Sequence, residues 1–373
     1  MISELAQQIA SRAEREIEAL ISIPTPSGDL DGAEDAVALC TALLPAEVEI
    51  ERLACSTPGG AADLLAQLRG RGERRLLLLG HLDTVAPPGG HPEVHREGER
   101  LYGTGAIDMK GGAVLALGVM RALASDPGRF AELALLLVTD EEWRVAEFAH
   151  AGRFTGYNGC LCFEAGERTS RGEEGVVVRR KAAGTLRVKA TGRAAHSGSA
   201  PDRGANALLA LARAATKLAA HHDPDGPERL SVVPTVLRSG EALNIVPPAG
   251  ELVLDLRARQ LSAFEAVVEE VPRDVDGVGL DATMDRRWPG MDSESSTAPL
   301  LARASELLGR PIAAVSRGGA SDASHFAPLI TLTVDGLGPR GGGAHTPDEF
   351  VLVSSLRDRA EIALAVAHAI LSS

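Results

Sequence analysis

The sequence has 373 residues, of which 45% are hydrophobic and 24% are charged, the ordinary balance of a globular protein with a packed core. Asp and Glu number 51 against 38 Lys and Arg, which gives a net charge of −13 and excludes a nucleic-acid backbone as the main partner. Only 3% of the residues are aromatic, too few for a surface on which bases stack.

The first part of the chain alternates between helical and strand-like segments. Helices are predicted over 2–20, before the Pro and Gly residues of 24–28, and over 32–45, 110–124 and 297–308; for the last, Ser296 and Thr297 provide a capped start before Pro299. Short apolar runs occupy 76–79, 133–138, 159–163 and 330–334. Such runs are typical of strands buried on both faces of a parallel sheet. We therefore predict a doubly wound, mostly parallel α/β domain.

Residues 180–290 have a different pattern. Strands are predicted over 184–191, 230–237, 251–257 and 277–285, and helices over 206–221 and 262–271. This βαββαβ order is that of a ferredoxin-like domain, so we predict that residues 179–291 are inserted into a domain formed by 1–178 and 292–373. Basic residues outnumber acidic ones thirteen to seven between 179 and 259, which indicates an ordinary solvated surface or, alternatively, a face that attracts an anionic substrate.

Three predicted strands run directly into histidine or carboxylate residues: His81-Leu-Asp83, Asp140-Glu141-Glu142 and Glu164. The carboxyl ends of parallel strands meet at one edge of a sheet, where ligands bind. Asp108 and His345, each in a glycine-rich loop, add two further groups. Any one of them alone is more often a surface or capping residue. Together, two histidines and three carboxylates suit a pair of divalent ions, zinc above all, with one carboxylate bridging them.

The neighbouring residues have alternative interpretations. Asp83 points the same way as His81 in a strand, so it is a candidate to orient the imidazole, and capping of a turn is the alternative. Glu141 beside a metal-bound Glu142 would be a base with a raised pKa, whereas the alternative is a solvated acidic loop. Cys160 and Cys162 share the face of Glu164, and we interpret them as small buried hydrophobes.

Five motifs occur in one order: His81-Leu-Asp-Thr-Val85, the loop Gly103–Gly112, Asp140-Glu141-Glu142, Glu164-Ala-Gly166 and Gly343-Ala-His345-Thr-Pro-Asp-Glu349. Over nearly the whole chain, this set resembles the di-zinc metallopeptidase family of glutamate carboxypeptidase, aminoacylase, acetylornithine deacetylase and succinyl-diaminopimelate desuccinylase. Segments 195–201, 204–208 and 243–247 are most similar to the glutamate carboxypeptidase branch.

The resemblance implies a role for each matched residue of the outer domain, which would be catalytic. His81 and Glu164 would bind one zinc, Glu142 and His345 the other, and Asp108, followed by a cis peptide bond, would bridge them. Glu141 would be general base and then general acid, and Asp83 would orient His81. Two Zn²⁺ per subunit are implied, with Co²⁺ or Mn²⁺ as substitutes.

The resemblance also makes the inserted domain a lid that forms a homodimer. His196 would then reach the active site of the partner subunit and polarise the scissile carbonyl. Asn244 and Arg257 would hold the carboxylate of the substrate, and Gly319 lies in the segment that matches the family's substrate loop. A guanidinium suits a carboxylate because it binds in a bidentate fork. An ion pair with Asp255, two residues away, is the alternative for Arg257.

One pair departs from the family pattern: Trp143-Arg144 stands where a small pair such as Gly-Ser is common. These side chains would reshape the pocket or pack outside it. The expected function is a zinc-dependent hydrolase that cleaves an amide bond next to a free carboxylate, as a glutamate carboxypeptidase does, on a small peptide or acyl-amino acid. The alternatives are an N-acyl-amino-acid deacylase or dipeptidase and, from another class, a non-catalytic metal-bound binding or scaffold protein.

The setting is expected to be cytoplasmic. The first twenty residues lack the basic start and apolar stretch of a signal peptide. Apolar runs such as 133–138 are far shorter than the roughly 20 residues that cross a membrane, so no membrane partner is expected. Four cysteines in so long a chain do not suggest a disulfide framework, which indicates a reducing compartment.

Overall fold

The computed structural model describes residues 1–85 and 90–372, and the chain forms two compact units. Unit 1 comprises Met1–Arg179, Asp292–Arg317 and Ser321–Ser373, and unit 2 comprises Arg180–Met291 with Gly318–Ala320. Within unit 2, the Arg180 guanidinium donates to the Gly319 carbonyl at 3.1 Å. The expected insertion of 179–291 starts one residue earlier and lacks this three-residue segment.

Unit 1 is built on a six-stranded sheet. In spatial order its strands are β1 (Glu49–Leu53), β2 (Asp63–Arg69), β6 (Glu132–Val138), β3 (Arg75–His81), β7 (Gly159–Cys162) and β17 (Thr333–Val334). The last four are parallel to one another, whereas β2 runs antiparallel to both β1 and β6. Leu76–Leu79 and Leu133–Val138 are fully buried because both faces of the sheet are covered. The mostly parallel α/β prediction is confirmed.

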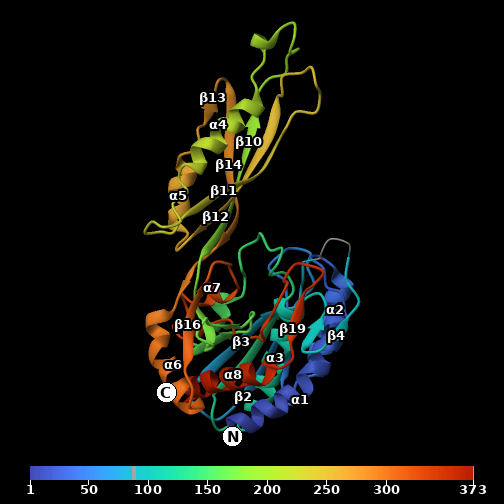
Figure 1. The fold of residues 1–373 in the computed structure, drawn as a ribbon, viewed down its shortest axis with the longest axis vertical. Helices are drawn as coiled ribbons and strands as arrows, with labels where there is room; N and C mark the ends of the chain where they lie inside the picture. Colours follow the sequence, from blue (N-terminus) through green and yellow to red (C-terminus); the bar gives the residue numbers. More distant parts are fainter. Residues whose placement is uncertain (86–89, 373) are drawn as a thin grey trace. The chain divides into compact units, whose positions relative to one another are not determined.

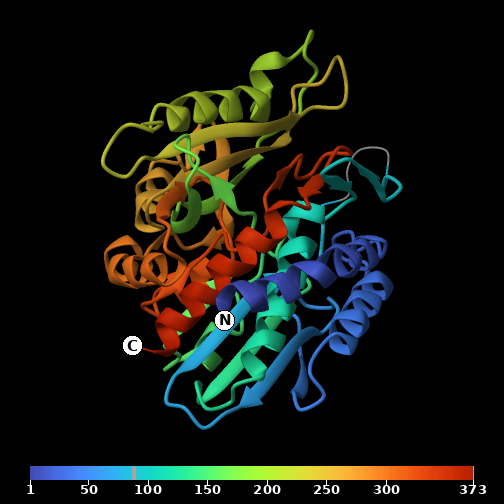
Figure 2. The ribbon, with the colours of Figure 1, turned by 60° about the horizontal axis from the view of Figure 1, so that its bottom comes forward.

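Four helices pack on one face of this sheet and form its main hydrophobic core: α1 (Ile2–Ile21), α2 (Leu30–Ala42), α3 (Gly111–Ala124) and α8 (Ser355–Leu371). Figure 2 shows α8 and α1 crossing above the strands. On the other face, α7 (Ala323–Phe326) packs against β7 and β17, and η2 (Ala151–Phe154) packs against α7. Across the described residues, no helix is both long and apolar enough to span a membrane.

Several short elements of unit 1 differ from the sequence prediction. Only two residues of the predicted strand 330–334 pair as β17. Helix α6 (Glu294–Leu308) begins three residues before Thr297, whose hydroxyl donates to the Ser293 carbonyl. Two small sheets were not predicted. One contains β8 (Glu167–Arg168), β9 (Glu174–Arg180), β15 (Met291–Asp292) and β16 (Ile312–Arg317), and the other β4 (His95–Glu97), β5 (Arg100–Tyr102), β18 (Gly341–Gly342) and β19 (Phe350–Leu352).

Unit 2 is an antiparallel sheet with two helices (Figure 1). The strand order is β11 (Ser231–Ser239), β12 (Ala249–Ala258), β10 (Ala182–Thr191), β14 (Val278–Trp288) and β13 (Asp274–Val275). Helices α4 (Ala207–Ala219) and α5 (Ser262–Glu269) share one core with alternating strand residues such as Leu186, Val188 and Leu254. This arrangement is the predicted ferredoxin-like order, and it leaves β11 as an edge strand.

Candidate metal centre

The structure brings all five predicted ligands together in unit 1. His81 ends β3, Glu142 follows β6, Glu164 follows β7, Asp108 lies in η1 (Ala106–Lys110), and His345 lies between β18 and β19. His81 Nε2 is 3.3 Å from Asp108 Oδ1 and 3.8 Å from Glu164 Oε1. His345 Nε2 is 3.2 Å from Asp108 Oδ2 and 3.0 Å from Glu142 Oε1. Each carboxylate oxygen of Asp108 therefore faces one imidazole.

This donor set fits a pair of divalent cations. Bonds of about 2.0–2.1 Å from a tetrahedral zinc to nitrogen or oxygen place neighbouring ligand atoms about 3.3 Å apart. The four distances above, from 3.0 to 3.8 Å, bracket that value. His81, Asp108 and Glu142 also offer ligand atoms that all lie within 4.8 Å of one another. The residues could hold one ion on each side of Asp108.

The electrostatics of the cluster also favour cations. Hydrogen bonds to Asp108 and Glu142 raise the pKa of His345 to about 10. Burial opposes protonation of His81, but Asp108 and Asp83 outweigh it and raise its pKa well above the usual range. Burial, with the nearby Glu142 carboxylate, raises the pKa of Glu141 well above that of an ordinary glutamate. The negative charge of these carboxylates stabilises the protonated imidazoles, and the same negative potential attracts a divalent cation.

Asp83 supports the cluster in both of the ways considered for it. Its main-chain carbonyl is 3.0 Å from His81 Nδ1 and its Oδ1 is 3.4 Å from the same nitrogen, which directs His81 Nε2 toward Asp108. Its carboxylate also accepts hydrogen bonds from the backbone N–H groups of Glu141 and Glu142, at 3.0 and 2.8 Å. A single buried carboxylate thus connects the end of β3 with the turn after β6.

Glu349 is a supporting residue that the sequence analysis did not single out. Its carboxylate is buried and accepts backbone N–H bonds from Gly105 at 2.9 Å and from Ile107 and Asp108 at 3.0 Å. These bonds fix the loop that presents Asp108, and the Asp108–Met109 peptide bond is cis, as the resemblance implied. The only sequence signal was its place at the end of the motif that contains His345.

Two glycines allow other segments to approach the end of β7, where Glu164 follows. A Cβ atom on Gly112, in the first turn of α3, would lie 1.8 Å from the Phe163 carbonyl oxygen, and one on Gly338 would lie 2.3 Å from it. The Gly338 N–H donates to the Glu164 carbonyl at 2.8 Å. Any larger residue at either position would displace the backbone that positions Glu164.

The Trp143-Arg144 pair packs inside unit 1. The Arg144 side chain is 0% exposed and its Nη2 lies 2.6 Å from Asp322 Oδ1. Trp143 is partly buried, and its indole N–H points to the Thr139 carbonyl at 3.4 Å. Of the two alternatives for this pair, the structure favours packing for Arg144. Cys160 and Cys162 are also buried, in agreement with their interpretation as small hydrophobes.

The remaining predicted residues belong to unit 2. His196 is exposed, and its Nδ1 accepts from the backbone N–H groups of Gly198 and Ser199 at 3.1 and 3.2 Å, which leaves Nε2 as the proton donor. Asn244 is exposed. Arg257 forms the alternative ion pair, with Nε 3.0 Å from Asp255 Oδ2 and Nη2 3.0 Å from Oδ1. Gly319 accepts from Arg180 through its carbonyl.

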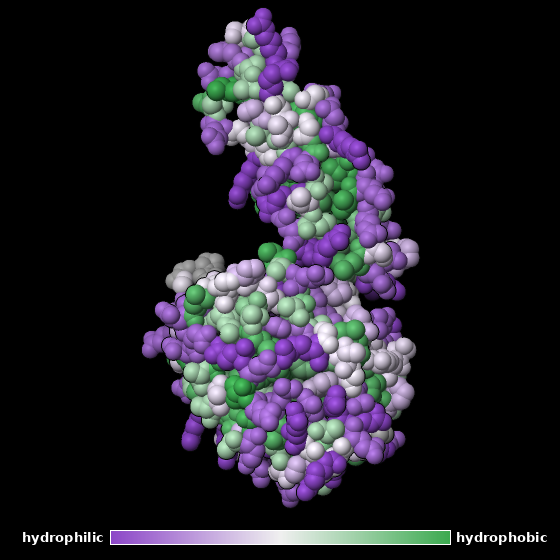
Figure 3. Space-filling view, turned by 180° about the vertical axis from the view of Figure 1, so that it is seen from behind, coloured by the Kyte–Doolittle hydropathy of each residue, from purple (hydrophilic) through white to green (hydrophobic). Residues whose placement is uncertain are grey.

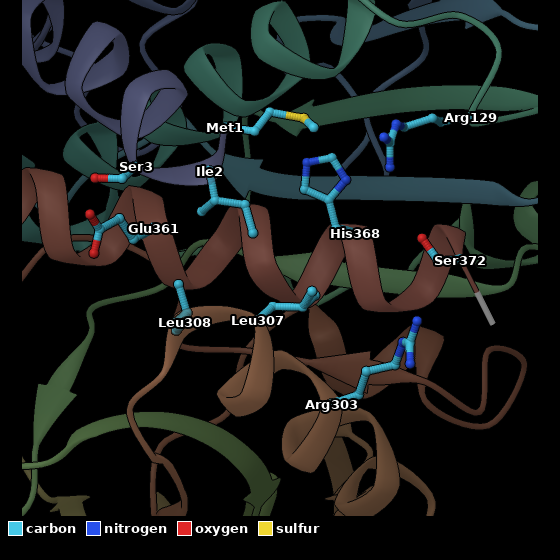
Figure 4. Close-up of a pocket in the computed structure, with 10 residues that line it drawn as sticks. All are labelled: Met1, Ile2, Ser3, Arg129, Arg303, Leu307, Leu308, Glu361, His368 and Ser372. Atoms are coloured by element: carbon cyan, nitrogen blue, oxygen red, sulfur yellow. The ribbon is translucent and has the colours of Figure 1, made fainter.

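A cavity of about 520 Å³ lies elsewhere in unit 1, between the start of α1, the end of α6 and α8 (Figure 4). Arg129, which lines it, precedes β6, whereas Glu142 follows that strand. β6 has seven residues, which span about 23 Å at the usual rise per residue. The cavity and Glu142 therefore lie at opposite ends of this strand. This cavity is not part of the histidine and carboxylate cluster.

Comparison with known proteins agrees with this geometry. Residues 77–369 match the Peptidase family M20/M25/M40. The chain is 31% identical over 344 residues to succinyl-diaminopimelate desuccinylase of Xylella fastidiosa (strain M12), covering 85% of this chain and 89% of the relative. It is 26% identical over 368 residues to carboxypeptidase G2 of Pseudomonas sp. (strain RS-16), covering 92% and 85%.

A solved structure shows the same fold. The YXEP protein of Bacillus subtilis, described as a dinuclear metal-binding peptidase of the M20 family, superimposes with a TM-score of 0.73 at 15% identity, over 98% of this chain and 99% of that chain. The family match spans the strands, loops and helices that carry all five predicted ligands. This chain therefore belongs to the M20/M25/M40 peptidase family.

Proposed function

We propose that this enzyme is a zinc-dependent hydrolase that cleaves an amide bond next to a free carboxylate, as a glutamate carboxypeptidase does. The observation that carries the proposal is the placement of Asp108 between two imidazoles, with Glu142 and Glu164 on either side. The likeness to carboxypeptidase G2 supports the choice of substrate class. Bound zinc ions would polarise the scissile carbonyl and acidify a water molecule.

Glu141 is the proposed general base and acid. Glu141 is buried, with 6% of its surface exposed, and its backbone N–H donates to Asp83 at 3.0 Å. One carboxylate oxygen of Glu141 would accept a proton from water as the water oxygen attacks the carbonyl carbon. The same oxygen would return that proton to the amide nitrogen as the C–N bond breaks. The raised pKa of Glu141 suits both transfers.

The substrate carboxylate is proposed to bind residues of the lid, which is unit 2. Arg257 offers a planar guanidinium, and a substrate carboxylate would share it with, or take it from, Asp255. Both of these side chains are about one-third exposed, so a ligand can reach them. Asn244 and Gly319 would also bind the substrate. A free carboxylate on one side of the amide would make cleavage exopeptidic.

The lid is proposed to form a homodimer, with β11 and α4 against a second copy of this chain. β11 is an edge strand, and exposed edges pair readily. Apolar side chains reach the surface of this unit (Figure 3), among them Leu209, Val233, Leu237 and Ile245, each at least 40% exposed. A second copy would bury them. His196, with its proton on Nε2, would then donate to the developing oxyanion in the partner subunit.

A second candidate function is an N-acyl-amino-acid deacylase. The relative at 31% identity is named a succinyl-diaminopimelate desuccinylase, and the same residues would cleave an acyl amide. A cytoplasmic location is proposed for either enzyme, since Cys40, Cys55, Cys160 and Cys162 are free thiols. A non-catalytic scaffold is disfavoured because all five ligands and Glu141 are present.

The test measures the turnover of a substrate panel by the zinc-loaded, full-length protein, with a chelator-treated sample as the control. The panel consists of acyl-glutamates, dipeptides, acetyl-amino acids and succinyl-amino acids. Chelator-sensitive turnover confined to acyl-glutamates supports the carboxypeptidase proposal. Turnover confined to succinyl- or acetyl-amino acids supports the deacylase instead. Two metals bound per chain with no turnover on the panel would contradict both.

A further inference from the structure

Arg144 is a buried cation two residues after Glu142, and nothing in the proposed chemistry uses it. Its side chain is 0% exposed, and its guanidinium contacts two carboxylates, Asp322 at 2.6 Å and Asp140 at 3.4 Å. The guanidinium carbon also lies 4.5 Å from the centroid of the Phe148 ring, within the range of a cation–π contact. A charge this deeply buried persists only where it is well compensated.

The first carboxylate belongs to the turn that carries Glu141 and Glu142. The Asp140 carbonyl accepts from the Arg144 backbone N–H at 2.9 Å, so this turn is closed through both backbone and side chain. Asp140 Oδ2 in addition accepts from the N–H and hydroxyl of Thr57, at 2.8 and 2.7 Å. Asp83 holds the N–H groups of Glu141 and Glu142 from the other side. Arg144 therefore anchors the turn together with Thr57 and Asp83.

The second carboxylate belongs to a distant segment. Asp322 is the residue before α7 and is 3% exposed. Phe148 packs against the same helix, with its ring centroid 5.4 Å from that of Phe326. Arg144 thus joins two segments that are 178 residues apart, the turn after β6 and the start of α7.

We propose that Arg144 is a positioning residue that, through Asp140 and Asp322, clamps the turn bearing Glu141 and Glu142 to the segment that begins α7. The kinetic part of its test rests on the proposed hydrolase function. Misplacement of a reacting group by about 1 Å costs on the order of 100-fold in rate. Loosening this clamp should therefore lower kcat more than it raises KM, because Arg144 contacts the turn and not the substrate-binding residues.

The experiment compares full-length, zinc-loaded Arg144→Met, Arg144→Lys and Arg144→Met/Asp322→Asn with the wild type. The control is Arg121→Met. Arg121, on α3, forms an ion pair of the same 2.6 Å length with Glu16, on α1, away from the cluster. The measurements are kcat and KM per folded molecule, zinc per chain, and hydrogen–deuterium exchange of peptides covering 139–150 and 320–327. The double variant removes the unpaired Asp322 charge and keeps the test informative if Arg144→Met alone does not fold.

The proposal expects Arg144→Met, or the double variant, to lose about 100-fold in kcat with KM changed less than about threefold. Exchange should rise in both peptides, and Arg144→Lys, which keeps the charge but not the fork, should recover part of kcat. Equal kcat in the Arg144 and Arg121 variants, or exchange that rises in neither peptide, would overturn it. If the wild type hydrolyses no substrate, the exchange of the two peptides still decides the clamp, separately from the proposed function.

Discussion

Replacement of Glu349 by glutamine tests how the loop of Asp108 is held. One oxygen of Glu349 accepts from the Gly105 N–H at 2.9 Å, and the other accepts from Ile107 and Asp108 at 3.0 Å each. A glutamine oxygen can keep the latter pair, but its NH₂ group would then face the Gly105 N–H. Two donors would be left without acceptors in a site that is 2% exposed.

The cost of this change follows from those two donors. An unsatisfied buried donor costs about 1–3 kcal/mol, so Glu349→Gln should lower the free energy of unfolding by about 2–6 kcal/mol. The matched control is Asp348→Asn, which removes the same charge from an exposed neighbour and should change stability by less than about 0.5 kcal/mol. Because Asp108 loses part of its support, the glutamine variant should also bind zinc more weakly than the control.

The assay is urea unfolding of the metal-free proteins, and folded aliquots of the same preparations are titrated with zinc. Burial raises the pKa of Glu349 to about 7, so the measurement is made at pH 8, where the carboxylate is ionised. If the free energy of unfolding of Glu349→Gln lies within about 0.5 kcal/mol of the values for both the wild type and Asp348→Asn, the three hydrogen bonds do not hold the loop and the reasoning is wrong.

Substitutions of Glu141 and His196 test their proposed roles, and a third substitution tests the buried His368. Glu141→Ala should lower kcat by about 10² to 10⁴-fold with zinc per chain unchanged, and near-normal turnover would remove Glu141 as the base. His196→Ala should impair turnover without unfolding, and mixing it with Glu141→Ala should restore activity if sites are shared across the dimer; an inactive mixture despite subunit exchange would argue against sharing. Burial lowers the pKa of His368 below its usual value, so the unfolded chain binds the proton more tightly and stability falls as the pH drops below about 6.5. Between pH 6.5 and 5, the thermal unfolding midpoint of His368→Leu should therefore fall less steeply with pH than that of the wild type. The control is His95→Leu, at an exposed residue. If the midpoint changes with pH equally in His368→Leu, His95→Leu and the wild type, the prediction is wrong.

The carboxyl ends of the central strands and the candidate ligands that follow them were predictable from the sequence. Strands β3 and β6 were predictable because strands covered on both faces are apolar throughout, a local signal that residues 76–79 and 133–138 display. His81 and Glu142 follow such strands, and parallel strands bring their carboxyl ends to one edge. The short strands β4, β5, β18 and β19 were not predictable, since two or three residues are too few to show a period.

The contacts that support the ligands form only in the folded chain. Glu349 binds the Asp108 loop across 241 to 244 residues of sequence, and Arg144 meets Asp322 across 178. No local pattern encodes such pairs, because the two partners have neither a shared period nor a shared motif spacing. A buried carboxylate or guanidinium acquires its role from the groups that desolvate and pair it, and those groups meet only when the chain has folded.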